Sequence, residues 1–138
     1  MTLSVDHVRA FIRVHHRAVL ATRRADGEPQ LSPVLVGVDD DGSLLISTRE
    51  TAMKTANVRR TATASVCVFE DGFFGEWVQA EGSASIESLP DAMDSLTRYY
   101  RAVAGEHEDW AEYRSAMHRE RRVILRISID RVGPTRAG

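Results

Sequence analysis

Hydrophobic and polar residues follow two different periods along this chain, one typical of helices and the other typical of strands. Ser4 is suited to cap an amino-terminal helix whose apolar residues recur at helical spacing up to about residue 16. From residue 17 the period becomes shorter and predicts strands over residues 18–22, 30–38 and 44–48. Turns rich in Asp and Gly separate these strands, so we expect an antiparallel meander.

The rest of the chain alternates between the same two periods. The pattern predicts a helix over 51–60, strands over 62–69 and 77–86, helical stretches over 89–104 and 110–117, and a strand over 123–130. Most strand connections are too short for parallel crossovers. We therefore expect a mainly β (α+β) fold, a six-stranded antiparallel barrel with peripheral helices.

Composition narrows the class of protein. All 138 residues are expected to form a single domain, residues 1–138, because no repeat, low-complexity stretch or linker interrupts the pattern. A single cysteine, Cys67, excludes an intrachain disulfide and is typical of a reducing compartment, so we expect a cytoplasmic protein. The chain has no apolar run long enough for a membrane span, and its net charge of −2 gives no cationic field. Neither a membrane nor nucleic acid is expected as a partner.

Several familiar catalytic patterns are absent. None of the five histidines is paired at the i, i+4 spacing of a helical metal site, so no bound metal is expected. The chain also lacks a G-x-S-x-G nucleophile elbow, a G-x-G-x-x-G segment after a strand, and a Walker sequence. The sequence therefore identifies no catalytic side chain.

One segment, residues 47–60, combines hydroxyl groups with cations as a predicted strand gives way to a helix. It contains Lys54, the only lysine among 18 basic residues. Hydroxyls and free backbone N–H groups at a helix amino terminus, with a lysine one turn further on, suit a phosphate group. The alternative interpretation is a capped, solvated helix with ordinary surface arginines.

Several segments resemble a known family in their order and spacing. They are VLAT (19–22), DGEPQLSP (26–33), ST (47–48), MK (53–54) with NVRR (57–60), ASV (64–66), VQAEGSA (78–84), and AGEHEDW (104–110) with YRSAM (113–117). Together they cover nearly the whole chain and resemble the pyridoxamine 5'-phosphate oxidase-like split β-barrel proteins, which bind flavins or deazaflavins. The last block is similar to the branch that uses the deazaflavin coenzyme F-420.

This resemblance implies a homodimer whose cofactor sites lie in clefts between the two subunits. It implies that Lys54 holds the cofactor phosphate and that Gln30 and Ser32 face the cofactor. Further positions that match the lining of the same cleft are Ser47, Thr48, Met53, Asn57 and Arg60, with Trp77 supplied by the partner chain. The implied activity is transfer of a hydride from reduced F-420 to an organic acceptor.

The chain departs from the FMN-using oxidases of the family at two positions. Those proteins carry an arginine and a lysine that grip the FMN phosphate, where this chain has Ser32 and Gly37. Two lost charge-assisted hydrogen bonds, at about 1.5–3 kcal/mol each, weaken FMN binding by a factor of roughly several hundred or more unless other groups substitute. This favours F-420. The alternatives are an FMN-binding protein of the same fold and a non-catalytic carrier of F-420, FMN or haem.

Overall fold

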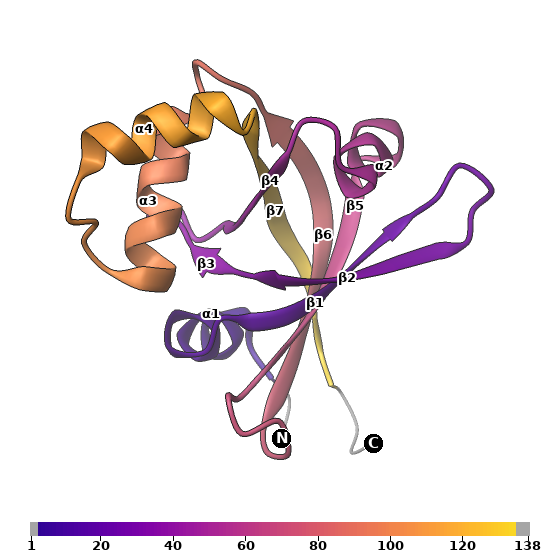
Figure 1. Ribbon diagram of the computed structural model, residues 1–138. Helices are drawn as coiled ribbons and strands as arrows, with labels where there is room; N and C mark the ends of the chain where they lie inside the picture. The colour runs from indigo at the N-terminus through magenta and orange to yellow at the C-terminus, as the bar shows by residue number, and fades with distance from the viewer. Residues whose placement is uncertain (1–2, 135–138) are drawn as a thin grey trace.

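A computed structural model, which describes residues 3–134, shows a seven-stranded antiparallel sheet with four helices around it (Figure 1). The helices are α1 (Val5–Val14), α2 (Met53–Thr61), α3 (Met93–Ala104) and α4 (Trp110–Arg119). The strands are β1 (Arg17–Arg23), β2 (Pro29–Leu35), β3 (Gly37–Val38), β4 (Leu44–Arg49), β5 (Thr63–Phe69), β6 (Trp77–Glu87) and β7 (Arg122–Gly133). Their order across the sheet is β2-β1-β5-β6-β7-β4-β3.

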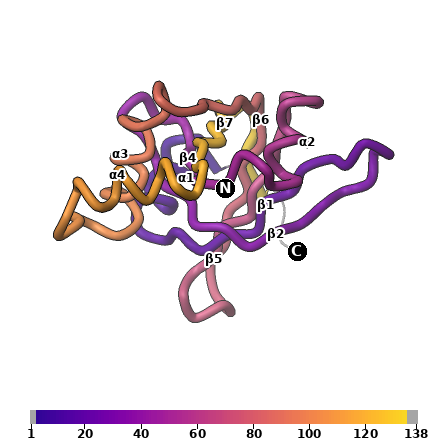
Figure 2. The backbone as a smooth tube through the Cα atoms, turned by 45° about the horizontal axis from the view of Figure 1, so that its top comes forward, coloured from indigo at the N-terminus to yellow at the C-terminus, as the bar shows by residue number. Residues whose placement is uncertain are grey.

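The two edge strands of this sheet are neighbours in the chain. Only Val36 separates the end of β2 from the start of β3, so the sheet curls until its edges approach each other (Figures 1 and 2). Val36 is buried, and its N–H donates to the carbonyl oxygen of His16 over 2.9 Å. The antiparallel, mainly β architecture is thus confirmed as a curled half-barrel. The predicted number of six strands is wrong, because the predicted strand 30–38 bends at Val36 into two.

Alternate residues of the strands fill the interior of the curled sheet. The side chains of Leu20, Ile46 and Ile127 are fully buried there, and α1 covers the same core with Val8 and Ile12. A second apolar cluster lies on the other face of β4 and β7. In it, α3 and α4 pack against Leu45 and Ile124, with Ala92, Leu96 and Tyr113 also buried.

A buried carboxylate fixes α3 to the sheet. Asp39 follows β3, and its side chain is only 4% exposed. It accepts hydrogen bonds from Arg98 Nε of α3 at 2.7 Å and from Arg126 Nη1 of β7 at 2.8 Å. Arg126 Nε in turn donates to Glu87 at the end of β6 over 2.6 Å. Asp39 therefore joins the β3–β4 turn to α3 and β7, and Arg126 extends the network to β6 through Glu87.

The short helix α2 begins just after the end of β4. Its start is held by Thr55, whose hydroxyl donates to the carbonyl oxygen of Arg49 over 2.7 Å. Its end is marked by Ala62, which has a left-handed backbone (φ 57°) and turns the chain into β5. The helix packs against β1 and β6, and both views show it beside the β1–β2 hairpin (Figures 1 and 2). The predicted helix over 51–60 is thus confirmed, with its start two residues later.

Candidate functional site

A cavity of about 310 Å³ lies where α2 begins. Its lining comes from the middle of β2, the end of β4, the start of α2 and the start of β7: Pro33, Val34, Ser47, Thr48, Arg49, Thr51, Ala52, Lys54 and Arg122. Three residues predicted from the sequence, Ser47, Thr48 and Lys54, are therefore brought to one cavity. Arg49, Thr51 and Arg122 were not predicted as site residues.

The cavity carries more positive than negative charge. Arg49 and Arg122 lie directly opposite each other on β4 and β7, an arrangement that repels unless an anion lies nearby. Glu120 supplies one negative charge, with Oε1 at 3.7 Å from Arg49 Nη2 and 2.9 Å from Arg122 Nη2. Lys54 adds a third cation to the lining. The lining thus holds three cations, of which two share one carboxylate, and this leaves a surplus of positive charge suited to an anionic ligand.

The amino end of α2 adds to this positive character. Ala52 occupies the N-cap position, makes no side-chain cap hydrogen bond, and is followed by a first turn without an acidic residue. By contrast, Ser4 caps α1 and Asp109 caps α4, each accepting from a backbone N–H. Because Ala52 itself lines the cavity, the partial positive charge of the helix end is directed there.

A second group of predicted residues forms a hydrogen-bonded chain beside α2. The Nη2 of Arg60 donates to the carbonyl oxygen of Arg23 over 2.5 Å and to Oδ1 of Asn57 over 2.9 Å. The Nδ2 of Asn57 donates to Gln30 Oε1 over 2.8 Å and to Thr22 Oγ1 over 3.1 Å. Asn57 is fully buried, so it acts inside the protein and has no exposed surface of its own.

The strand β2 connects this chain with the cavity. Gln30, Ser32 and Val34 alternate along β2 and share one face, opposite Thr22, Leu20 and Ala18 of β1. Gln30 contacts Asn57, Val34 lines the cavity, and Ser32 lies between them. The β2 residues Gln30 and Ser32 therefore lie on the same strand face as Val34 of the cavity, and Asn57 supports Gln30 from inside the protein.

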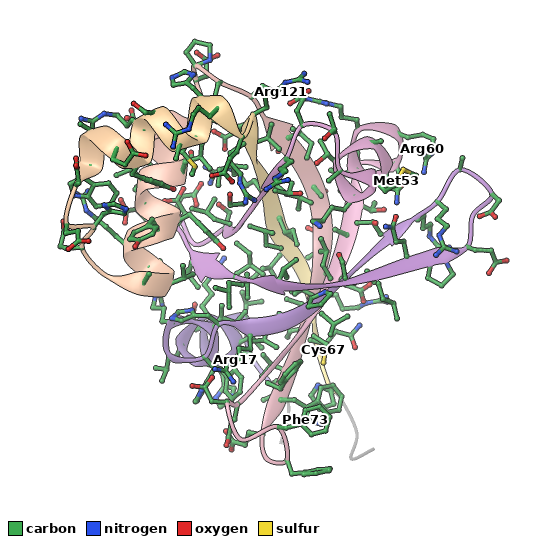
Figure 3. The ribbon with its side chains drawn as sticks, viewed as in Figure 1. Arg17, Met53, Arg60, Cys67, Phe73 and Arg121 are labelled. Carbon is green, nitrogen blue, oxygen red and sulfur yellow. The ribbon has the colours of Figure 1, made fainter. Side chains whose placement is uncertain are left out.

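Two further predicted residues do not line the cavity. Met53 is largely exposed, and Figure 3 shows it on α2 near Arg60. Trp77 begins β6 opposite Phe69, close to the hairpin loop that carries Phe73. Figure 3 places Phe73 at the opposite end of the molecule from Met53. Within one chain, Trp77 is thus not part of the cavity around Lys54.

A larger cavity, of about 660 Å³, lies on the outer side of β1, β5 and β6. Two of its charges are already paired, since Arg131 Nε donates to Glu81 Oε1 over 2.5 Å. This hydrogen bond holds the pKa of Glu81 below its ordinary value. Arg23 and Asp130 add one further charge of each sign, so the cavity has no surplus of either sign. The smaller cavity at Lys54 is the better candidate for binding a phosphate.

The fold and this cationic cavity define the class of protein to which the chain belongs. Residues 4–136 match the family described as pyridoxamine 5'-phosphate oxidase, and the chain is a member of that family. Over 131 residues it is 32% identical to a biliverdin reductase of Mycobacterium tuberculosis that depends on reduced F-420, covering 92% of this chain and 85% of that protein. The chain is thus a homologue of an F-420-dependent reductase.

Solved structures show the same fold. A conserved hypothetical protein of Mycobacterium tuberculosis superposes with a TM-score of 0.76 at 24% identity, covering 96% of this chain and 84% of that one. An F-420 reductase superposes with a TM-score of 0.70 at 17% identity, covering 91% of this chain and 94% of that one. At these identities the likeness concerns the fold.

Proposed function

We propose that this protein is an oxidoreductase that uses coenzyme F-420 to reduce an organic acceptor. The observation that carries the proposal is the surplus of cations in the cavity at the start of α2, in a chain that is 32% identical to an F-420-dependent reductase. A phosphate fits this donor set, because Lys54, Arg49 and Arg122 offer charged donors and the end of α2 offers backbone N–H groups.

The residues of the chain bind and orient, while the coenzyme, when bound, supplies the hydride. Lys54, Arg49 and Arg122 hold the phosphate, and the hydroxyl groups of Ser47 and Thr48 add neutral donors beside them. Gln30 and Ser32 on β2 face the rest of the cofactor and fix its position against the sheet. The natural acceptor is an electrophilic organic molecule.

The charge argument against FMN changes once the structure is known. Gly37 has no room for a cation, since a Cβ there would lie 2.9 Å from the Cβ of Ala102 on α3. Arg49 and Arg122, from β4 and β7, supply the missing charges instead. Our preference for F-420 over FMN therefore rests on the 32% identity to an F-420-dependent reductase. It no longer rests on a lack of phosphate-binding cations.

Fluorescence titration of the purified protein with F-420 and, separately, with FMN tests the proposal. We expect F-420 to bind with a micromolar or lower Kd and FMN to bind more weakly. Reduced F-420 should then be consumed only when an acceptor from a panel of conjugated or tetrapyrrole compounds is added. Binding without consumption across the panel would indicate a carrier, and a preference for FMN would indicate a flavin protein of the same fold.

We also propose that a second copy of this chain covers the outer face of β1 and β2. Leu31 is 65% exposed, and Leu35 is also exposed; both lie on the face of β2 opposite to Gln30. Phe73, Phe74 and Trp77 are further exposed apolar residues at the β5–β6 hairpin. Apolar surface of this kind is typical of a protein interface. In the family's arrangement, Trp77 would then reach the partner's cofactor.

Replacing Leu31 by glutamate tests this interface. We expect the Kd of the dimer to rise at least about tenfold, because an apolar contact is lost and a charge is introduced. Light scattering over a concentration series measures the change. Val14→Glu is the matched control, since Val14 is also exposed, at 70%, but lies at the end of α1. A monomeric wild-type protein, or equal effects of both variants, would contradict the proposed interface.

Residues 3–134 contain no helix that is both long and apolar enough to cross a membrane.

A further inference from the structure

The hydrogen-bonded chain beside α2 has a fixed direction, which begins at Arg60. An arginine side chain has donors and no acceptor, so the atom of Asn57 that faces Arg60 has to be the oxygen. The other end of the Asn57 amide is therefore the nitrogen, and it faces Gln30 and Thr22. The orientation of the buried amide thus follows from the chemistry of Arg60.

The orientation of Asn57 determines that of Gln30. The Asn57 Nδ2 atom can only donate, so Gln30 has to present its Oε1 atom to it, 2.8 Å away. The amide nitrogen of Gln30 is consequently turned away from Asn57. Every buried side-chain nitrogen or oxygen in residues 3–134 has a hydrogen-bond partner, and in this range Gln30 Nε2 donates to none. Its N–H groups therefore lie at the surface.

We propose that Asn57 is a positioning residue that fixes Gln30 as a hydrogen-bond donor toward the bound cofactor. The N–H groups of Gln30 then select an acceptor on the ligand, a carbonyl oxygen or an unprotonated ring nitrogen of a planar heterocycle. A ligand that offers an N–H at this point is rejected, because Gln30 cannot turn without breaking its bond to Asn57. The identity of the ligand rests on the proposed function, but the orientation of Gln30 does not.

Replacing Asn57 by aspartate keeps the shape of the side chain and the bond from Arg60, but reverses the direction of the hydrogen bond between residue 57 and Gln30. Aspartate only accepts, so it pairs with Arg60, and Gln30 has to turn its nitrogen inward and its oxygen outward. We expect the affinity for F-420 to fall about five- to tenfold in a fluorescence titration. In a Gln30→Ala background the same replacement should change the affinity less than twofold, because Asn57 acts through Gln30.

Thr22→Val is the matched control. It removes the other acceptor of Asn57 from the same buried network and leaves the bond to Gln30 in place. We expect it to lower thermal stability while F-420 affinity stays within twofold of the wild type. If Asn57→Asp and Gln30→Ala instead weaken binding additively, Asn57 has only a structural role and the proposal is overturned.

A second measurement needs no cofactor and separates this proposal from the proposed function. In an NMR spectrum of the wild-type protein, the side-chain NH2 of Asn57 should exchange slowly with water and that of Gln30 quickly. In Asn57→Asp the NH2 of Gln30 should become protected. Slow exchange at Gln30 in the wild type would overturn the inference even if F-420 binds. Failure of the wild type to bind F-420 would overturn the proposed function. The hydrogen-exchange measurement would still decide whether Asn57 fixes the orientation of Gln30.

Discussion

Replacing Asp39 by alanine is expected to lower the free energy of unfolding by about 2–3 kcal/mol at pH 7. The reason is that Arg98 and Arg126 both donate hydrogen bonds to this carboxylate and would lose that partner. Their side chains are only 38% and 18% exposed, respectively, so water replaces the lost contact incompletely. Breaking a fully buried ion pair costs about 3–5 kcal/mol, and the partial exposure of both arginines reduces that figure. Urea denaturation measures the change, provided that the slope against urea concentration is unaltered.

The matched control for this variant is Asp40→Ala. Asp40 is the next residue in the same turn, but its side chain is exposed, so its loss should change the free energy of unfolding by less than about 0.5 kcal/mol. Equal destabilisation by the two variants would show that the turn itself, and not the contacts of Asp39 with α3 and β7, is responsible.

The lowered pKa of Asp39 predicts how the free energy of unfolding depends on pH. Burial alone raises the pKa of Asp39, but hydrogen bonds from Arg98 and Arg126 outweigh burial and lower it from 3.8 to about 2. A lowered pKa means that the folded state holds the ionised form more strongly than the unfolded chain does. This contribution is fully present above about pH 5 and is lost as the pH falls through 4 toward 2. The Asp39→Ala variant should therefore lose less stability than the wild type between pH 4 and pH 2.

Much of the fold could be predicted because its signals are local. The turn around Gly27 and the strands on either side of it lie within a few residues of each other, and both were visible as a change of period. The break at Val36 was missed, although Gly37 directly after it is a residue type that often marks a bend within a strand. At the break, Val36 is buried and its N–H donates to the carbonyl oxygen of His16, a contact between residues twenty positions apart.

In the candidate site, too, residues close together in the sequence were predicted, and residues brought there by strand pairing were not. Lys54 and Ser47 belong to one short segment and were predicted together from its hydroxyls and cations. Arg122 lies far away in the sequence and reaches the cavity only through the pairing of β7 with β4, which the sequence does not specify. Asn57 was predicted as a residue lining the cleft; in the structure it is fully buried and hydrogen-bonded to Gln30, a contact that no local pattern specifies.

Lys54→Ala is expected to weaken binding of F-420 about thirtyfold. A hydrogen bond to a charged group contributes about 1.5–3 kcal/mol, and the uncapped end of α2 together with Arg49 and Arg122 would retain part of the affinity for phosphate. The measurement is a fluorescence titration at one fixed salt concentration, since the attraction between Lys54 and an anion is screened by salt.

Two controls separate loss of a phosphate contact from other effects of this variant. Arg114→Ala removes an exposed cation on α4 that does not line the cavity, and it should leave the affinity unchanged. The deazaflavin ring system without its phosphate-bearing chain should bind equally well to the wild type and to Lys54→Ala, because it cannot use the contact that is lost. A fall of less than about threefold for F-420, under ~0.7 kcal/mol, would show that Lys54 does not hold the phosphate. An equal fall for both ligands would show that Lys54 acts on the ring or on the fold, and the cations from β4 and β7 would then be the remaining candidates for the phosphate.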